Sequence, residues 1–131
     1  MFAFFRAMRI DVRTPCNPTE DARKVERAMK NVFPDLDIKK EAGFLVGTGS
    51  SMERLGDLLK NQMIRSAARG VFLSSCSDNE VSFALNKQVA FIGKVSFGSG
   101  SPLGDIEVRI TDDNIEALID SIAPRIGDVN E

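Results

Sequence analysis

The sequence predicts an α+β fold, a two-layer sandwich in which helices pack on one face of a mixed or antiparallel sheet. Some stretches place an apolar residue at every second position, and others place one every three or four positions. The first pattern is typical of half-buried strands and the second of amphipathic helices. A predicted hairpin beside these helices favours α+β. The expected order is β-α-β-β-α-β-β-β-α, and 131 residues fit one domain with one core.

The first strand is predicted at 8–13, where apolar and charged residues alternate. We expect the domain to span residues 8–126, with an N-terminal extension at 1–7 and a C-terminal tail at 127–131. A helix should follow, with Asn17 as its cap, Pro18 in its first position and Glu20 in its third. It should end before Pro34. Its buried stripe comprises Val25, Ala28, Met29 and Val32.

In the middle of the chain, a short strand or turn is predicted at 36–38 and a strand at 43–47. A glycine and serine turn then opens a second helix, for which Ser50 is the expected cap and Glu53 the matching third residue. The helical spacing continues as far as Leu73, which predicts the longest helix of the chain.

A hairpin is predicted in the second half, because apolar residues alternate over 81–85 and again over 89–97. A further strand at 106–110 leads to the last helix. Thr111 and Asp112 compete as its cap, and Pro124 follows its end.

Composition narrows the function classes. The chain has no histidine, so histidine-assisted nucleophiles and the zinc sites that use His are excluded. Two cysteines sixty positions apart form no metal motif. No apolar run approaches the roughly 18 residues of a membrane helix. We therefore expect a cytoplasmic protein without a cofactor or a metal, and binding rather than catalysis.

The net charge is −2, but it is unevenly distributed. Residues 1–104 carry 15 basic and 11 acidic side chains, whereas residues 105–131 carry 2 basic and 8 acidic ones. A basic face is therefore compatible with the acidic total. Five cations were assigned to it as RNA contacts, since phosphates bind charge irrespective of sequence: Arg54, Arg65, Arg69, Lys87 and Lys94. If these cations converge in space, RNA binding is favoured; if they scatter, a protein-interaction module is favoured.

Two further segments have alternative interpretations. The turn Gly47, Gly49, Ser50 and Ser51 joins a strand to a helix, which is where backbone N–H groups hold phosphates, but it lacks a complete dinucleotide or P-loop motif. It is either an anion site or a tight turn with a serine cap. Asn86, Lys87 and Gln88 either reverse the chain, with Lys87 solvated, or contact a ligand or a second subunit.

The acidic residues near the last helix also have two interpretations. Asp112 and Asp113, together with Asp105 and Glu107, have the oxygen ligands of a divalent-cation site. Adjacent acids at the start of a helix are more often caps and partners of the helix dipole. No metal site is predicted from them.

Several segments together resemble an archaeal family of uncharacterised proteins labelled "predicted RNA-binding", and the likeness runs from Met8 to Pro124. They are 17–21, 61–69, 85–88, 93–97 and 101–104. The resemblance implies a fold similar to the large-subunit ribosomal protein of the L-five type, homodimers, and RNA as a partner. Some relatives are joined to a domain resembling dephospho-coenzyme A kinases, which implies an accessory role beside nucleotide chemistry. It implies no catalytic residue.

The sequence therefore leaves two hypotheses of different classes. The first is recognition of structured RNA through a basic face. The second is a homodimeric protein-interaction module with no role in RNA binding.

Overall fold

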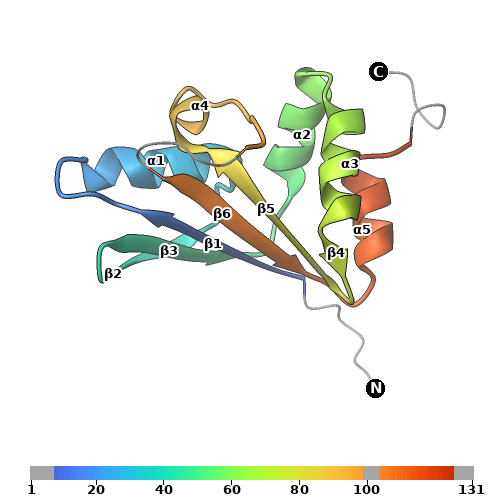
Figure 1. Cartoon of the computed structure of the whole chain (residues 1–131), viewed down its shortest axis with the longest axis horizontal. Helices are drawn as coiled ribbons and strands as arrows, with labels where there is room; N and C mark the ends of the chain where they lie inside the picture. The colour runs from blue at the N-terminus through green and yellow to red at the C-terminus, as the bar shows by residue number, and fades with distance from the viewer. Residues whose placement is uncertain (1–7, 99–103, 126–131) are drawn as a thin grey trace.

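A computed structural model describes residues 8–98 and 104–125 of the chain (Figure 1). The strands are β1 (Arg9–Pro15), β2 (Asp37–Glu41), β3 (Phe44–Gly49), β4 (Cys76–Ser77), β5 (Glu80–Asn86) and β6 (Asp105–Thr111). The helices are α1 (Ala22–Val32), α2 (Glu53–Asn61), α3 (Arg65–Ser74), α4 (Lys87–Phe91) and α5 (Ile115–Ile122). The predicted extension at 1–7 and tail at 127–131 lie outside the described residues.

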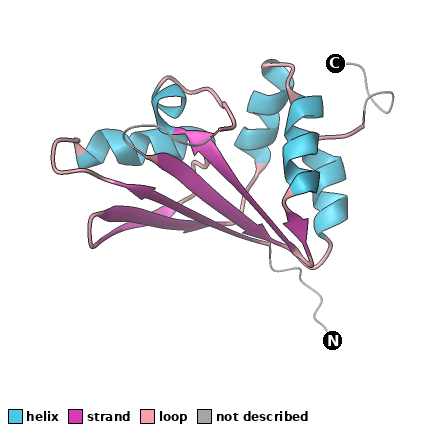
Figure 2. Ribbon diagram, in the orientation of Figure 1, coloured by secondary structure: helices cyan, strands magenta, loops and turns pink. Residues whose placement is uncertain are grey.

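The six strands form one sheet in the order β2-β3-β1-β6-β5-β4, and every neighbouring pair is antiparallel. The helices cover one face of this sheet, with α1 and α4 over one end and α2, α3 and α5 over the other (Figures 1 and 2). The predicted α+β sandwich is confirmed.

The core lies between the sheet and these helices. In the central strands, Val12 pairs with Val108, and Ile110 pairs with both Ile10 and Val81. All five side chains are buried. The residues between them point to the open face, as the period of two predicts.

The predicted second strand of the hairpin is wrong, because α4 occupies its first half. The Asn86 side chain caps this helix by accepting a hydrogen bond from the Val89 N–H at 3.0 Å. Gly93 follows with φ +76°, which a strand does not adopt. Only an isolated bridge between Leu85 and Phe97 remains of the expected pairing.

The predicted long helix is also wrong, since the chain breaks at 62–64 into α2 and α3. Met63 adopts φ +59°, which is uncommon for a residue with a side chain. The Gln62 side chain explains the break: its amide nitrogen donates to the Val95 carbonyl at 2.9 Å, and its oxygen accepts from the Val95 N–H at 2.8 Å. The two tertiary hydrogen bonds of Gln62 are thus formed where the helix would otherwise continue.

The helix caps differ from the predicted ones by a few residues. Asn17 and Glu20 form a separate turn, in which the Glu20 carboxylate accepts from the Asn17 backbone N–H at 3.0 Å. Asp21 caps α1 instead, by accepting from the Arg23 N–H at 2.9 Å. The helix therefore begins at Ala22 rather than at Pro18.

The other two helix starts also differ. Met52 precedes α2 without a side-chain cap, and Ser50 lies outside the helix. Asn114 caps α5 by accepting from the Ala117 N–H at 3.1 Å, and Asp112 supports that turn by accepting from the Asn114 N–H at 2.9 Å. Several neighbouring Ser, Thr, Asn and Asp side chains can each cap a helix, so the sequence alone does not identify which one does.

Gly104 is expected to be intolerant of a side chain. It has φ +90°, and a Cβ there would lie 2.2 Å from Cγ of the rigid Pro15 ring. Gly104→Ala should lower the free energy of unfolding by about 2–4 kcal/mol, since backbone strain and overpacking add. Urea denaturation measures this. Gly70→Ala is the matched control: it lies in α3 with open space around the added carbon, and should leave stability unchanged or raise it. Equal stability of both variants would contradict the prediction.

Candidate nucleic-acid interface

The outward face of α1 is basic. This helix contains four cations and one acid, Glu26. Three of the cations, Arg23, Arg27 and Lys30, follow the spacing i, i+4 and i+7, so they share one face. All three are exposed, and they point away from the face that buries Val25, Ala28, Met29 and Val32. We call these three residues the basic stripe.

One acidic residue adjoins the basic stripe without neutralising it. Glu26 Oε2 lies 3.6 Å from Lys30 Nζ, and both side chains are nearly half exposed. An exposed pair of this kind contributes little, so it leaves Lys30 able to exchange partners. The stripe, Glu26 and Asn31 line a shallow surface hollow.

Asn31 joins the basic stripe to α4. Its amide nitrogen donates to the carbonyl oxygens of Ala90 at 2.8 Å and Phe91 at 3.4 Å, at the C-terminal end of α4. The next two exposed side chains along the chain are Ile92 and Lys94. Lys94 follows α4 and is one of the predicted RNA contacts that the structure leaves exposed.

Lys87 is not part of that surface, and the prediction that it is solvated is wrong. Its side chain is completely buried, and its ammonium donates to the Pro15 carbonyl at 2.7 Å and to the Glu20 carboxylate at 3.0 and 3.2 Å. The neighbouring residues have distinct roles: Asn86 caps α4 and Gln88 is exposed on it. Lys87 therefore holds α4 against the turn that follows β1.

The Glu20 carboxylate is stabilised in its charged form. Burial by itself raises the pKa of Glu20, but the hydrogen bond from the Asn17 backbone and the Lys87 ammonium outweigh this effect and hold the pKa below its ordinary value. Glu20 and Lys87 thus form a buried salt bridge in which the Glu20 carboxylate is held in its charged form.

The other predicted cations do not converge. Arg69 is engaged with α5: its guanidinium donates to Asp120 at 2.7 Å and to the Ala123 carbonyl at 3.0 Å. Arg65 is largely buried at the start of α3, and Arg54 is exposed on α2. With Lys87 buried and Lys94 beside α4, the five side chains lie in separate environments. They do not form the shared face that the RNA hypothesis required of them.

Of the predicted glycine and serine turn, Gly47 and Gly49 belong to β3, and an acidic side chain occupies the turn that follows at Ser50. Asp35 accepts hydrogen bonds from the Ser50 backbone N–H at 2.9 Å and from its hydroxyl at 3.4 Å. A Cβ at Gly49 would lie 2.8 Å from the same carboxylate, and one at Gly47 would lie 3.1 Å from Ile38. The glycines are thus explained by close packing, and Asp35 fills the position that a bound anion would take.

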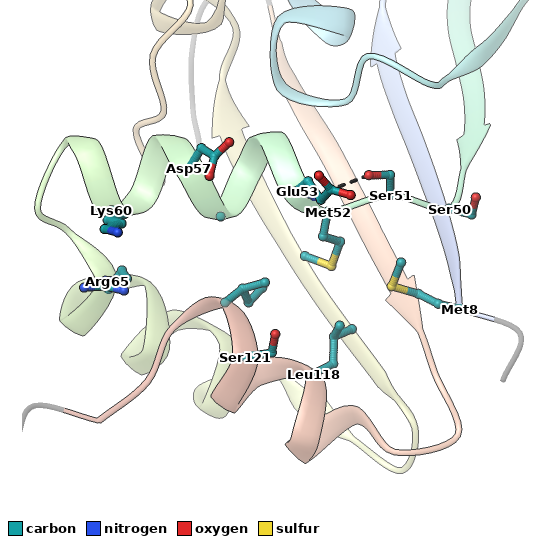
Figure 3. A pocket seen from close by; sticks show the side chains of 12 residues that line it. Met8, Ser50, Ser51, Met52, Glu53, Asp57, Lys60, Arg65, Leu118 and Ser121 are labelled. Atoms are coloured by element: carbon teal, nitrogen blue, oxygen red, sulfur yellow. Dashed lines mark hydrogen bonds between the residues drawn. The ribbon is translucent and has the colours of Figure 1, made fainter. Parts of the chain in front are cut away.

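A hollow between α2 and α5 has a mixed lining (Figure 3). Glu53, Asp57, Lys60 and Arg65 contribute both signs of charge, and Ser51 accepts from the Glu53 N–H at 3.4 Å. Neither sign of charge dominates the lining. Within residues 8–98 and 104–125, no three potential metal ligands cluster, which includes the acids near Asp112. The same part of the chain has no helix long and apolar enough to cross a membrane.

The helices α1 and α5 carry opposite net charges. α5 contains Glu116 and Asp120 and no cation, in contrast to α1. The two helices lie over opposite ends of the sheet (Figure 1). The uneven charge of the sequence is therefore also uneven in space, with the basic side on α1.

Sequence reasoning missed the basic stripe although its signal was present. The spacing that identifies the buried face of α1 also places Arg23, Arg27 and Lys30 together on the opposite face. The RNA contacts are instead predicted mainly on the second helix, because the sequence predicts a long helix there that carries several cations.

Fold and surface together define a small α+β domain with a basic face on α1. The model of a protein family described as RNA binding matches residues 9–112. The chain therefore belongs to this family.

Its relatives are archaeal proteins named UPF0201. One from Methanothermobacter thermautotrophicus is 39% identical over 122 residues, which cover 90% of this chain and 92% of the relative. One from Pyrococcus horikoshii is 36% identical and covers 91% of each chain. A longer relative from Archaeoglobus fulgidus, named UPF0200/UPF0201, is 36% identical, and the match covers 91% of this chain but 38% of that protein.

Solved structures share the fold. The crystal structure of an uncharacterized UPF0201 protein matches with a TM-score of 0.86 and 34% identity, over 94% of this chain and 98% of the other. The UPF0201 protein from Methanococcus jannaschii matches with a TM-score of 0.82 and 36% identity, over 89% and 93%.

Proposed function

We propose that this domain binds structured RNA through the basic stripe and Lys94, mainly by contacts to phosphates. The observation that carries the proposal is the stripe itself: three exposed cations on one face of α1, with Asn31 connecting them to the helix beside Lys94. Phosphate contacts need charge in a fixed arrangement and little else. The family description as RNA binding supports the same partner.

The role is binding rather than catalysis, and it is exercised in the cytoplasm. Support comes from the absence of histidine in the whole chain and from the mixed lining of the hollow between α2 and α5. The RNA surface proposed here replaces Arg54, Arg65, Arg69 and Lys87 by the residues of α1 and keeps Lys94.

A homodimeric interaction module is the second candidate, and the open face of the sheet favours it. Opposite charges alternate there in paired positions: Arg13 lies beside Glu107, and Asp11 beside Arg109. A surface carrying both signs in rows can match a second copy of itself. The longer Archaeoglobus relative, named UPF0200/UPF0201, fits the related idea that the domain accompanies a further domain, because the match covers 38% of that protein.

The test is binding to a pool of cellular RNA at low salt. The stripe variant, Arg23→Gln/Arg27→Gln/Lys30→Gln, should bind roughly ten- to hundredfold more weakly than the wild type, since three charged contacts are lost. The control is the sheet variant, Arg9→Gln/Lys39→Gln/Arg109→Gln, which removes the same charge from exposed positions on the open side of the sheet. It should retain most of the affinity.

Two results would overturn the RNA proposal. Equal weakening of both variants would mean that binding follows net charge and not the stripe. Absence of binding by the wild type, together with a dimeric mass in sedimentation equilibrium, would favour the interaction module.

A further inference from the structure

The segment 86–97 is held rigidly although most of it is irregular. Three sets of contacts between distant positions fasten it, namely Lys87 to Glu20 and Pro15, Asn31 to the end of α4, and Gln62 to Val95. Asn86 adds a local cap to the first turn of α4. Ordering a loop costs conformational entropy, so fixing it at both ends with several tertiary hydrogen bonds indicates a defined surface.

This surface exposes an apolar side chain where none is needed for the core. Ile92 is 71% exposed, and it follows α4 directly. Met63 is 67% exposed and lies next to Gln62, which binds Val95. The left-handed backbone of Met63 adds strain at the same place. Ile92 and Met63 are thus exposed apolar side chains on or beside a segment that tertiary hydrogen bonds fix.

The chemistry of the surface combines three kinds of group. The basic stripe and Lys94 supply cations, Gln88 supplies an exposed amide, and Ile92 supplies an apolar contact. Aromatic side chains are not among the exposed groups of α1 and α4, where Phe91 is half-buried. Recognition of single-stranded RNA depends on bases stacked on aromatic rings, so this surface does not fit it.

We infer that the surface formed by the basic stripe, Gln88, Ile92 and Lys94 binds double-helical RNA across its minor groove. The inference rests on the proposed function and names its substrate class. The minor groove of an RNA duplex is wide and shallow and displays 2′-hydroxyl groups, while its major groove is too narrow for side chains. Cations on a convex helix contact the phosphates at the edges of that groove. The Gln88 amide donates to and accepts from 2′-hydroxyls, and Ile92 packs on ribose carbons.

The test compares three probes of one base sequence: an RNA duplex, the single-stranded RNA and the DNA duplex. The wild type should bind the RNA duplex about tenfold or more tightly than either alternative. Gln88→Ala/Ile92→Ala should bring the affinity for the RNA duplex close to that for the DNA duplex and should weaken DNA binding much less, because the 2′-hydroxyl contact exists only in RNA. Leu73→Ala is the control, as it removes an exposed apolar side chain of α3 and should leave the preference intact.

Each other outcome overturns the inference. Equal or tighter binding of single-stranded RNA would assign the surface to unpaired bases, and equal binding of the DNA duplex would show that the ribose is not recognised. In both cases RNA still binds, and the proposed function stands. If none of the three probes binds, the proposed function fails together with the inference. A preference that survives Gln88→Ala/Ile92→Ala places recognition elsewhere on the domain.

Discussion

Lys87→Ala should lower the free energy of unfolding by about 3–5 kcal/mol, because it leaves a buried carboxylate without its counter-charge. The Glu20 side chain is 8% exposed, and the Pro15 carbonyl also loses the donor at 2.7 Å. Guanidinium denaturation measures the loss as a shift in the midpoint at constant slope. A loss below about 1 kcal/mol would mean that water replaces the ammonium and that the pair is not structural.

The control for this prediction is the double variant Glu20→Gln/Lys87→Met. It removes both charges together and keeps side chains of similar length, so it should be clearly more stable than Lys87→Met alone. Equal destabilisation of the two proteins would show that the lysine acts through its packing and not through its charge. Circular dichroism at low temperature separates weakened proteins from unfolded ones.

The same pair predicts how stability responds to acid. The folded-state pKa of Glu20 lies below its ordinary value of 4.5, so its carboxylate binds protons more weakly in the folded protein than in the unfolded chain. The stability that this group contributes is therefore fully present above that ordinary value and is lost as the pH falls through the lowered pKa. Glu20→Gln should remove this part of the acid dependence, measured by denaturation at a series of pH values below 5.

The stripe variant should show a weaker salt dependence of RNA binding than the sheet variant, although both variants remove three positive charges. Each phosphate contact contributes close to one unit to the slope of log affinity against log salt, so the stripe variant should lose roughly 2–3 units of slope. The sheet variant should keep the slope of the wild type. The measurement is a titration by fluorescence anisotropy at four or more salt concentrations.

One result of the salt titration would contradict the assignment of the stripe cations as phosphate contacts. If the stripe variant loses affinity but keeps its slope, the three cations act through the fold of α1 and not through phosphates. Thermal denaturation of both variants decides that point, because exposed Arg and Lys positions on α1 should tolerate glutamine with little change in stability.

Much of the fold could be predicted from local pattern. The strands at 8–13, 43–47, 81–85 and 106–110 correspond to β1, β3, β5 and β6, and the buried face of α1 contains the four predicted residues. Burial of one face imposes a period of two on a strand and of 3.6 on a helix, so these elements are readable from neighbours in the sequence.

The errors share one physical cause. Segment 89–97 has the alternation of a strand, but Asn86 caps a helix there and Gln62 pairs with Val95 across the chain. Segment 52–73 has the spacing of one helix, but the same Gln62 contact breaks it. In each case a tertiary hydrogen bond outweighed a local preference that was worth only fractions of a kcal/mol per residue.

The candidate site shows the same limit. Lys94 was identified from the sequence and is exposed, whereas Lys87 was assigned to the surface and is buried. Lysine is almost never fully buried unless it is paired, so exposure is the expected state. The partner, Glu20, lies 67 positions away and cannot be identified from the segment around Lys87. The basic stripe was readable from spacing, but its importance depends on which side of α1 faces the core.

The sequence by itself determined the α+β class, the main strands, the amphipathic faces and the uneven distribution of charge. These properties depend on residue types and on spacings of a few positions. Only the tertiary structure decided that α4 replaces a strand, that Lys87 forms a buried salt bridge and that Asn31 connects α1 to the end of α4. The contacts responsible join residues 72, 67, 59 and 33 positions apart, and such contacts leave no local pattern in the chain.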